Sequence, residues 1–241
     1  MSEVKTVLIT GGSRGIGEQV AYEFSRHGYA VAITFVAEGE KAKSVVSNCL
    51  KLGASRALDA RLDLRESQSI LDLINFIKKE LPKLDVLVNN AAAIGKGPLQ
   101  TQSFELIEDQ IRANLEGVIK LTSALLPIIN GSIVNIGSNL SFHAKPNLTV
   151  YVATKFGIRG FTKSLAKEQR QIKVYSIHPG LTATDMGNSA GVSADRVAKI
   201  VFNTVVGNYK LPSGSDILVR YYLHGPIRRI ALRIYDFFKS L

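Results

Sequence analysis

The residues with the clearest chemical potential are a tyrosine and a lysine four positions apart, Tyr151 and Lys155, with Ser138 upstream. In a helix, both side chains would project from the same face. At about 4 Å and an effective dielectric near 20, a lysine ammonium stabilises a phenolate by about 4 kcal/mol. That would bring a tyrosine pKa from about 10 to about 7. Tyr151 is therefore a candidate proton donor and acceptor, with the Ser138 hydroxyl holding a substrate oxygen against it.

This spacing alone is also compatible with an unremarkable surface helix, but a glycine-rich turn near the start supports a chemical role. Residues 4–10 form an apolar, β-branched run, and a helical pattern begins at the end of the turn. A strand, a glycine turn and a helix in this order are typical of dinucleotide binding, because glycines let the backbone approach phosphate closely. The helix N-terminus then offers free N–H groups. An ordinary turn with capping glycines is the alternative. The turn comprises Thr10, Gly11, Gly12, Ser13, Arg14, Gly15, Ile16 and Gly17.

The second expected strand, 29–35, bears on the choice of cofactor. An acid at its tip would accept the ribose hydroxyls and favour NAD, but no acid occurs there before Glu38. Arg14 could instead pair with a 2′-phosphate, with help from Lys41 or Lys43. The sequence therefore favours NADP(H), with NAD(H) as the alternative if Arg14 is only a solvated loop residue.

Strands and helices alternate along the chain, which predicts an α/β fold with a parallel sheet. The run 84–88 is nearly continuous in apolar residues, as expected of a parallel strand covered on both faces. Ligands bind at the carboxyl ends of such strands, where Asp63, Leu64, Asn90 and Ser138 are expected. Asn114 falls inside a long helix, where a core amide is the simplest interpretation. Further strands are expected at 55–62, 131–136, 173–177 and 216–219, and helices at 38–52, 66–80, 103–127 and 149–171.

Composition limits the possible classes of protein. Alternating elements without a Pro/Ser-rich linker favour one domain in a chain of 241 residues. The single cysteine, Cys49, excludes an intramolecular disulfide and a multi-cysteine metal site, and we expect no metal. Residues 4–9 form a strand rather than a signal segment, and no apolar run is long enough to span a bilayer. We therefore expect a cytoplasmic protein.

The net charge of +10 suits nucleic acid, an anionic membrane, a phosphorylated cofactor or an acidic carrier partner. Residues 220–241 hold five basic residues and one acidic residue, and the remaining charge is spread without a dense cluster. No recognised nucleic-acid module accompanies it, so we expect no nucleic-acid partner.

Six segments together resemble the short-chain dehydrogenase/reductase family, of its classical type. They occur in the order and spacing of that family over about residues 4–186. The resemblance implies a single Rossmann-type doubly wound domain, with a seven-stranded parallel sheet and helices on both faces. It also implies a nicotinamide cofactor. The segments are Thr10–Gly17, Asn89–Ala92, Asn114, Ser138, Tyr151–Lys155 and Pro179–Thr184.

The resemblance implies catalytic roles as well. Tyr151 would be the acid/base, Lys155 would lower its pKa and bind the nicotinamide ribose, and Ser138 would orient the substrate. Asn114 would help to hold a water-linked proton path to Lys155, in place of the core-amide interpretation.

The same resemblance implies a cofactor-binding set. Asp63 would lie by the adenine and Thr184 by the carboxamide, while Arg14 is the usual indication of NADP. The full set is Thr10, Gly11, Ser13, Arg14, Gly15, Ile16, Gly17, Asp63, Leu64, Asn90, Ala91, Tyr151, Lys155, Pro179, Gly180 and Thr184.

Three departures from the family pattern concern the cofactor pocket and the substrate side. Ala92 replaces the glycine of the Asn-Asn-Ala-Gly motif. The segment from Pro179 to the last strand is short, so the substrate lid within 185–193 would be small and the pocket open. The usual C-terminal ending is replaced by a basic extension, 221–241, after a catalytic domain over 1–220.

The extension has two interpretations. From Ile227 its apolar residues form a helical stripe, with most basic residues off the stripe. An interfacial helix on an anionic membrane has this pattern, and so does a helix packed on its own domain or a second subunit. Packing on protein is the commoner case and is favoured here.

Together these observations predict an NADP(H)-dependent reductase of a ketone or aldehyde, acting on a small carbonyl/alcohol substrate and assembled as a homo-oligomer. One alternative is a catalytically silent, NADP-binding regulator or scaffold, which the intact set of candidate catalytic residues argues against. Another is a membrane-associated reductase of a lipid-like substrate, which the basic extension and the short lid would suit.

Overall fold

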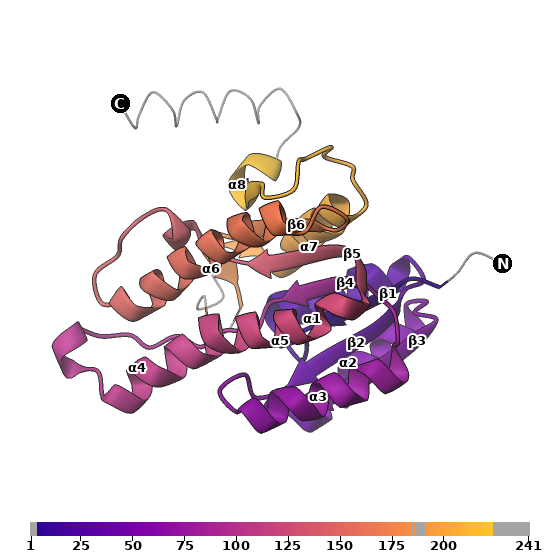
Figure 1. The fold of residues 1–241 in the computed structure, drawn as a ribbon, viewed down its shortest axis with the longest axis horizontal. Helices are drawn as coiled ribbons and strands as arrows, with labels where there is room; N and C mark the ends of the chain where they lie inside the picture. The colour runs from indigo at the N-terminus through magenta and orange to yellow at the C-terminus, as the bar shows by residue number, and fades with distance from the viewer. Residues whose placement is uncertain (1–3, 185, 187–190, 224–241) are drawn as a thin grey trace.

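The computed structural model describes residues 4–184, 186 and 191–223 as a twisted sheet covered by helices on both faces (Figure 1). The sheet has seven parallel strands in the order β3-β2-β1-β4-β5-β6-β9. The predicted fold class is thereby confirmed. The strands of this sheet are β1 (Thr6–Ile9), β2 (Ala30–Phe35), β3 (Arg56–Arg61), β4 (Leu84–Asn89), β5 (Ile129–Ile136), β6 (Lys173–His178) and β9 (Asp216–Leu218).

Helices follow the strands in alternation, as the apolar periodicity predicts. The α-helices are α1 (Gly15–Arg26), α2 (Gly39–Lys51), α3 (Ser67–Glu80), α4 (Phe104–Ile111), α5 (Gly117–Leu125), α6 (Thr149–Glu168), α7 (Ala194–Val205) and α8 (Val219–Tyr222). Shorter elements are the 3₁₀ turns η1 (Leu99–Thr101), η3 (Leu126–Ile128) and η4 (Asn139–Ser141), the π-turn η2 (Arg112–Glu116), and the strand pair β7 (Thr182–Ala183) with β8 (Val192–Ser193).

Two apolar clusters hold the layers together, one on each face of the sheet. Helices α1, α2 and α7 cover one face, and α3, α5 and α6 cover the other (Figure 1). On α3, four apolar residues at helical spacing are buried: Ile70, Leu73, Ile74 and Ile77. Burial on both faces explains why the strands read as continuous apolar runs.

The strand order changes direction at β1, so that later strands are added on the opposite side of the sheet from β2 and β3. Strands β2 and β3 follow β1 on one side, while β4, β5, β6 and β9 extend the other side. Such a switch point leaves a crevice at the carboxyl ends of the strands, where ligands bind in open α/β sheets. The candidate cofactor residues after β1 and β4 flank this point.

Several predicted boundaries differ from those observed. The predicted helix 103–127 is divided into α4, the π-turn η2 and α5, and the helix predicted at 149–171 ends at Glu168. The pair β7 and β8 was not predicted, because each strand has only two residues. Most of the predicted lid, and the apolar stripe from Ile227, lie outside the described residues. The division into a catalytic domain over 1–220 and an extension over 221–241 stays a prediction; residue 220 lies in α8, and Tyr222 packs against the core.

Candidate active site

The fold brings Ser138, Tyr151 and Lys155 together at the carboxyl edge of the sheet. Ser138 follows β5 after Gly137 and caps the turn η4, with its hydroxyl accepting from the Leu140 N–H at 3.1 Å. Tyr151 and Lys155 lie in the first two turns of α6, where the Ser138 side chain is close enough to the phenol to affect the pKa of Tyr151. All three side chains belong to buried residues. A carbonyl oxygen between the two hydroxyls would therefore meet two donors away from water.

Burial controls the electrostatics of this pair. It raises the pKa of Tyr151 to about 12, while the hydrogen bond from Ser138 acts in the opposite direction. Burial also lowers the pKa of Lys155 to about 8. Each shift disfavours the charged form of its group, as desolvation must.

The expected lowering of the Tyr151 pKa by Lys155 is not observed in this arrangement. The Lys155 ammonium donates to the Ile136 carbonyl at 2.9 Å and lies 5.5 Å from the centre of the tyrosine ring. Desolvation of the phenolate outweighs the ammonium at this separation. In this state Tyr151 is a protonated phenol and thus a proton donor.

Asn114 sits in the π-turn between α4 and α5, where an irregular turn interrupts the long helix. Its side chain accepts from the Ala93 N–H at 2.7 Å and donates to the Ala93 carbonyl at 2.8 Å. It also donates to the Thr154 hydroxyl at 3.2 Å, beside Lys155 on α6. Single π-turns inside helices are frequent at functional sites. Asn114 therefore joins the loop after β4 to the catalytic helix, and its role in a proton path stays a prediction.

The glycine turn has the close contacts that a dinucleotide site requires. Gly15 has φ +60°, and a Cβ there would come 3.3 Å from the Thr184 methyl group. A Cβ on Gly17 would lie 2.2 Å from the Gly11 carbonyl oxygen. The turn therefore accepts no side chain at Gly17, and Thr184 faces the turn from the loop after β6. Ile16 packs against the core below α1.

Asn90 lies at the carboxyl edge of the sheet, as predicted, and ties the ends of β1 and β4 together. Its amide donates to the carbonyls of Thr10 and Gly11 at 2.9 and 3.0 Å. The Thr10 hydroxyl in turn accepts from the backbone N–H groups of Asn90 and Ala91. These hydrogen bonds thus fix the glycine turn to the neighbouring strand end.

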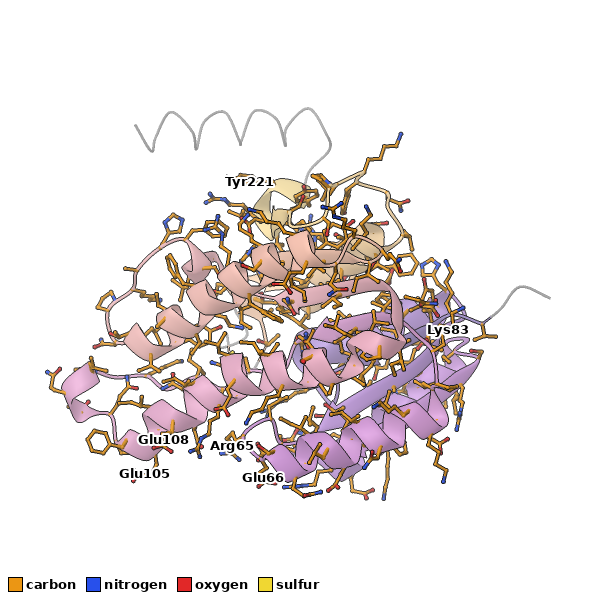
Figure 2. The ribbon with its side chains drawn as sticks, in the orientation of Figure 1. Arg65, Glu66, Lys83, Glu105, Glu108 and Tyr221 are labelled. Carbon is orange, nitrogen blue, oxygen red and sulfur yellow. The ribbon has the colours of Figure 1, made fainter. Side chains whose placement is uncertain are left out.

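Asp63 and Leu64 follow β3 but have different surroundings. The Asp63 carboxylate is held by Arg65, whose hydrogen bonds to it lower the carboxyl pKa despite burial. Arg65 reaches on to Asp109 of α4 at 2.7 Å, and Figure 2 labels it at the start of α3. The Leu64 side chain packs in the core. Asp63 is therefore an oriented acceptor at the sheet edge, while cofactor contact by Leu64 stays a prediction.

The remaining predicted residues lie in the loop after β6 and in the glycine turn. The Pro179 carbonyl accepts from the Asn139 N–H at 2.8 Å, and the Gly180 carbonyl accepts from the Thr182 hydroxyl at 3.2 Å. Arg14 forms an ion pair with Glu38 at 3.5 Å, and Lys41 pairs with the same carboxylate oxygen at 3.0 Å. Ser13 and Arg14 line an open cleft of about 290 Å³.

Sequence reasoning did not assign every residue that supports the site. Asn135 of β5 accepts from Asn89 at 2.8 Å and donates to Thr162 of α6 at 2.9 Å, which fixes α6 against the sheet. His178 of β6 contacts the Ser138 carbonyl. In each case the available signal was a polar residue near the carboxyl end of a strand, next to apolar neighbours. Among the described residues, no group of three or more His, Cys, Asp or Glu side chains could hold a metal ion. No helix in the described part of the chain is long and apolar enough to span a bilayer.

A glycine turn at the switch point of a parallel sheet, together with a buried tyrosine, serine and lysine, defines a class of dinucleotide-binding proteins with an acid/base site. Residues 5–194 match the model of a family described as short chain dehydrogenase. The 3-oxoacyl-[acyl-carrier-protein] reductase FabG of Haemophilus influenzae is 35% identical over 219 residues, covering 88% of this chain and 87% of the relative. The Staphylococcus aureus FabG is 35% identical over 193 residues, covering 77% and 78%.

Solved structures agree with the sequence relatives. A short chain dehydrogenase from Burkholderia cenocepacia, in complex with NADP, superposes with a TM-score of 0.83 at 29% identity, covering 89% of this chain and 95% of that one. This chain belongs to the short-chain dehydrogenase/reductase family. It is an NAD(P)-dependent oxidoreductase.

Proposed function

We propose that this protein is an NADPH-dependent carbonyl reductase. The observation that carries the proposal is the buried group of Ser138, Tyr151 and Lys155 at the carboxyl edge of the sheet, in which the Ser138 side chain acts on the pKa of the phenol. When bound, the nicotinamide supplies a hydride to the carbonyl carbon. Tyr151 supplies the proton to the carbonyl oxygen, and Ser138 holds that oxygen by a hydrogen bond. A ketone then leaves as the secondary alcohol, and an aldehyde as the primary alcohol.

The residues present fit a dinucleotide. Gly11 and Gly15 have positive φ, and Gly17 leaves no room for a side chain, so the turn brings backbone close to a phosphate. The start of α1 faces the same place. Lys155 would bind the nicotinamide ribose and Thr184 the carboxamide. Lys155 also keeps positive charge near the phenol, which stabilises the phenolate left after proton donation.

Two basic residues support NADP over NAD. Arg14 and Lys41 converge on Glu38 at the edge of a cleft that both line, so a 2′-phosphate would meet two cations there. The ion pairs of Glu38 with Arg14 and Lys41 would have to break for the phosphate to bind them. The Burkholderia cenocepacia structure contains NADP, and a blue fluorescent protein from a metagenomic library, 26% identical with a TM-score of 0.84 and covering 89% of this chain and 96% of that one, contains NADPH.

Arg14→Ala is expected to weaken NADPH binding about 10- to 100-fold and NADH binding less than threefold. The reason is that a charge-assisted bond to phosphate contributes about 1.5–3 kcal/mol, and NADH has no 2′-phosphate. Dissociation constants follow from nucleotide fluorescence titrations. Arg26→Ala is the matched control, because it removes an arginine from the other end of α1. Equal losses for both nucleotides would contradict the NADP assignment.

The relatives suggest which carbonyl to test first. Two relatives at 35% identity are named as reductases of 3-oxoacyl thioesters on acyl carrier protein. The net charge of +10 would also suit an acidic carrier. NADPH and NADH oxidation at 340 nm should be followed with 3-oxoacyl thioesters, simple ketones, aldehydes and quinones. NADPH binding without turnover on any of them would favour the silent regulator instead.

A membrane-surface role for the basic extension is a second candidate. Residues 220–241 carry five basic residues and one acid around an apolar stripe. If this role holds, the full chain sediments with vesicles of anionic lipid at low salt, while a chain ending at residue 223 stays in solution. Vesicles of neutral lipid are the control. Failure of the full chain to sediment would leave packing on protein, in the domain or in a homo-oligomer, as the role of the extension.

A further inference from the structure

His178 is a buried histidine at the carboxyl end of β6, in contact with the backbone of the candidate active site. Its Nδ1 atom lies 3.1 Å from the Ser138 carbonyl oxygen. A carbonyl oxygen only accepts, so Nδ1 must carry hydrogen and donate. The Ser138 carbonyl also accepts from the Ser141 N–H at 2.9 Å, so both of its lone pairs are engaged.

The histidine ring also packs directly against the chain that leads into Ser138. A Cβ built on Gly137 would come 2.5 Å from Nδ1, which means that the glycine leaves the space that the ring occupies. The Phe142 ring meets the imidazole edge to face, with centroids 4.8 Å apart. The backbone on both sides of Ser138 is therefore fitted around this ring.

The opposite edge of the ring is held by the end of the sheet. His178 Nε2 lies 2.9 Å from the Ser176 hydroxyl and 3.2 Å from the Asp216 carboxylate. The Ser176 hydroxyl donates to the same carboxylate oxygen at 2.9 Å. Asp216 is the first residue of β9, which pairs with β6. The contact between Asp216 and His178, which are far apart in the sequence, thus fixes the imidazole ring that contacts the Ser138 carbonyl.

Asp216 also receives two cations from the catalytic helix. Arg159 and Lys163 of α6 each lie 2.9 Å from its second oxygen. Although burial would raise the carboxyl pKa, hydrogen bonds from four neighbours hold it well below the usual range. Asp216 is therefore an anion that binds His178 on one side and the helix of Tyr151 on the other.

We propose that His178 is a positioning residue for catalysis, whose Nδ1–H sets the orientation of Ser138 relative to Tyr151. Asp216 and Ser176 hold the ring in place for this bond. The inference rests on the proposed function, since it assigns Ser138 to the binding of the carbonyl oxygen. A small displacement of a hydrogen-bond donor from the substrate oxygen lowers the catalytic rate without abolishing nucleotide binding.

Two substitutions of His178 separate its bond to the Ser138 carbonyl from its bonds to Ser176 and Asp216. In His178→Asn the side-chain amide nitrogen can occupy the place of Nδ1 and keep the bond to the Ser138 carbonyl. In His178→Gln the amide nitrogen reaches the place of Nε2, so the bonds to Ser176 and Asp216 survive and the one to Ser138 is lost. Both amides are polar and close to the ring in size, so the comparison isolates the contact.

We expect His178→Gln to lower kcat at least tenfold, with an unchanged NADPH dissociation constant, and His178→Asn to keep at least a third of kcat. Melting temperatures and NADPH binding report whether each variant is folded. The reverse order of kcat, or equal kcat in both variants, would overturn the proposal. In either case the ring would serve only to anchor the end of the sheet.

A second measurement does not depend on turnover. Nitrogen-15 NMR of the histidine side chains in the full chain is expected to show a slowly exchanging Nδ1–H for His178, identified by its loss in His178→Gln. A ring with hydrogen on Nε2 alone would overturn the proposal. Wild-type protein that binds NADPH but reduces no carbonyl would instead refute the proposed function, and the NMR result would still decide the geometry.

Discussion

Tyr151→Phe should reduce turnover by about 10²–10⁴-fold, the usual contribution of a positioned general acid. The substitution removes the only proton that we assign to the carbonyl oxygen, and it keeps the buried ring in place. The NADPH dissociation constant should stay within about twofold, because the phenol is not needed to hold the phosphates. Steady-state kinetics at 340 nm, with fluorescence titration of the nucleotide, measure both quantities.

Tyr175→Phe is the matched control for this prediction. Tyr175 is also a buried tyrosine, in β6, and its hydroxyl lies 3.3 Å from the Leu211 carbonyl, away from the candidate site. Its loss should leave kcat within about twofold of the wild type. If Tyr151→Phe kept a tenth or more of wild-type turnover, the acid would be a different group.

Gly17→Ala should abolish nucleotide binding at micromolar concentrations. The added methyl group would lie 2.2 Å from the Gly11 carbonyl oxygen and 2.6 Å from the Asn90 amide nitrogen, so the glycine turn must move. Overpacking of this kind costs about 1–3 kcal/mol, which lowers the melting temperature of a chain of this size by several degrees. Calorimetry and fluorescence titration give the two results.

Gly160→Ala serves as the control for a glycine that the site does not need. Gly160 is an exposed residue of α6, and a Cβ there would meet no atom within 4 Å. Alanine should raise the stability by about 0.5–1 kcal/mol, because it reduces the freedom of the unfolded chain. Nucleotide binding should not change. Tight NADPH binding by Gly17→Ala would mean that phosphate is bound elsewhere.

Local patterns carried much of the prediction. The strand that ends at Ile9 and the helix that begins at Gly15 are close in the sequence, so the glycine turn could be placed from local patterns, although the helix begins inside the predicted turn. The helix predicted at 66–80 is observed as α3, and its apolar residues at helical spacing, Ile70, Leu73, Ile74 and Ile77, are buried. Asn90 was expected at the carboxyl edge of the sheet, and there its amide makes two hydrogen bonds to the end of β1.

Contacts between distant segments could not be predicted in the same way. The contact between His178 and Asp216 needs the pairing of β6 with β9, which no local pattern specifies. The Tyr151 pKa was predicted to fall because only the charge of Lys155 was considered. Its direction depends on how far the folded chain removes the phenol from water. The π-turn around Asn114 likewise gives no periodic signal.

The place of Asp216 in the chain also bears on how the protein is made. Ser138, Tyr151 and Lys155 leave the ribosome well before β9, and domains generally fold from the N-terminus during synthesis. Until β9 emerges and pairs with β6, the ring of His178 lacks its carboxylate partner and α6 lacks two ion pairs. A nascent chain that already contains every candidate catalytic side chain therefore does not yet have the arrangement that would make it an enzyme.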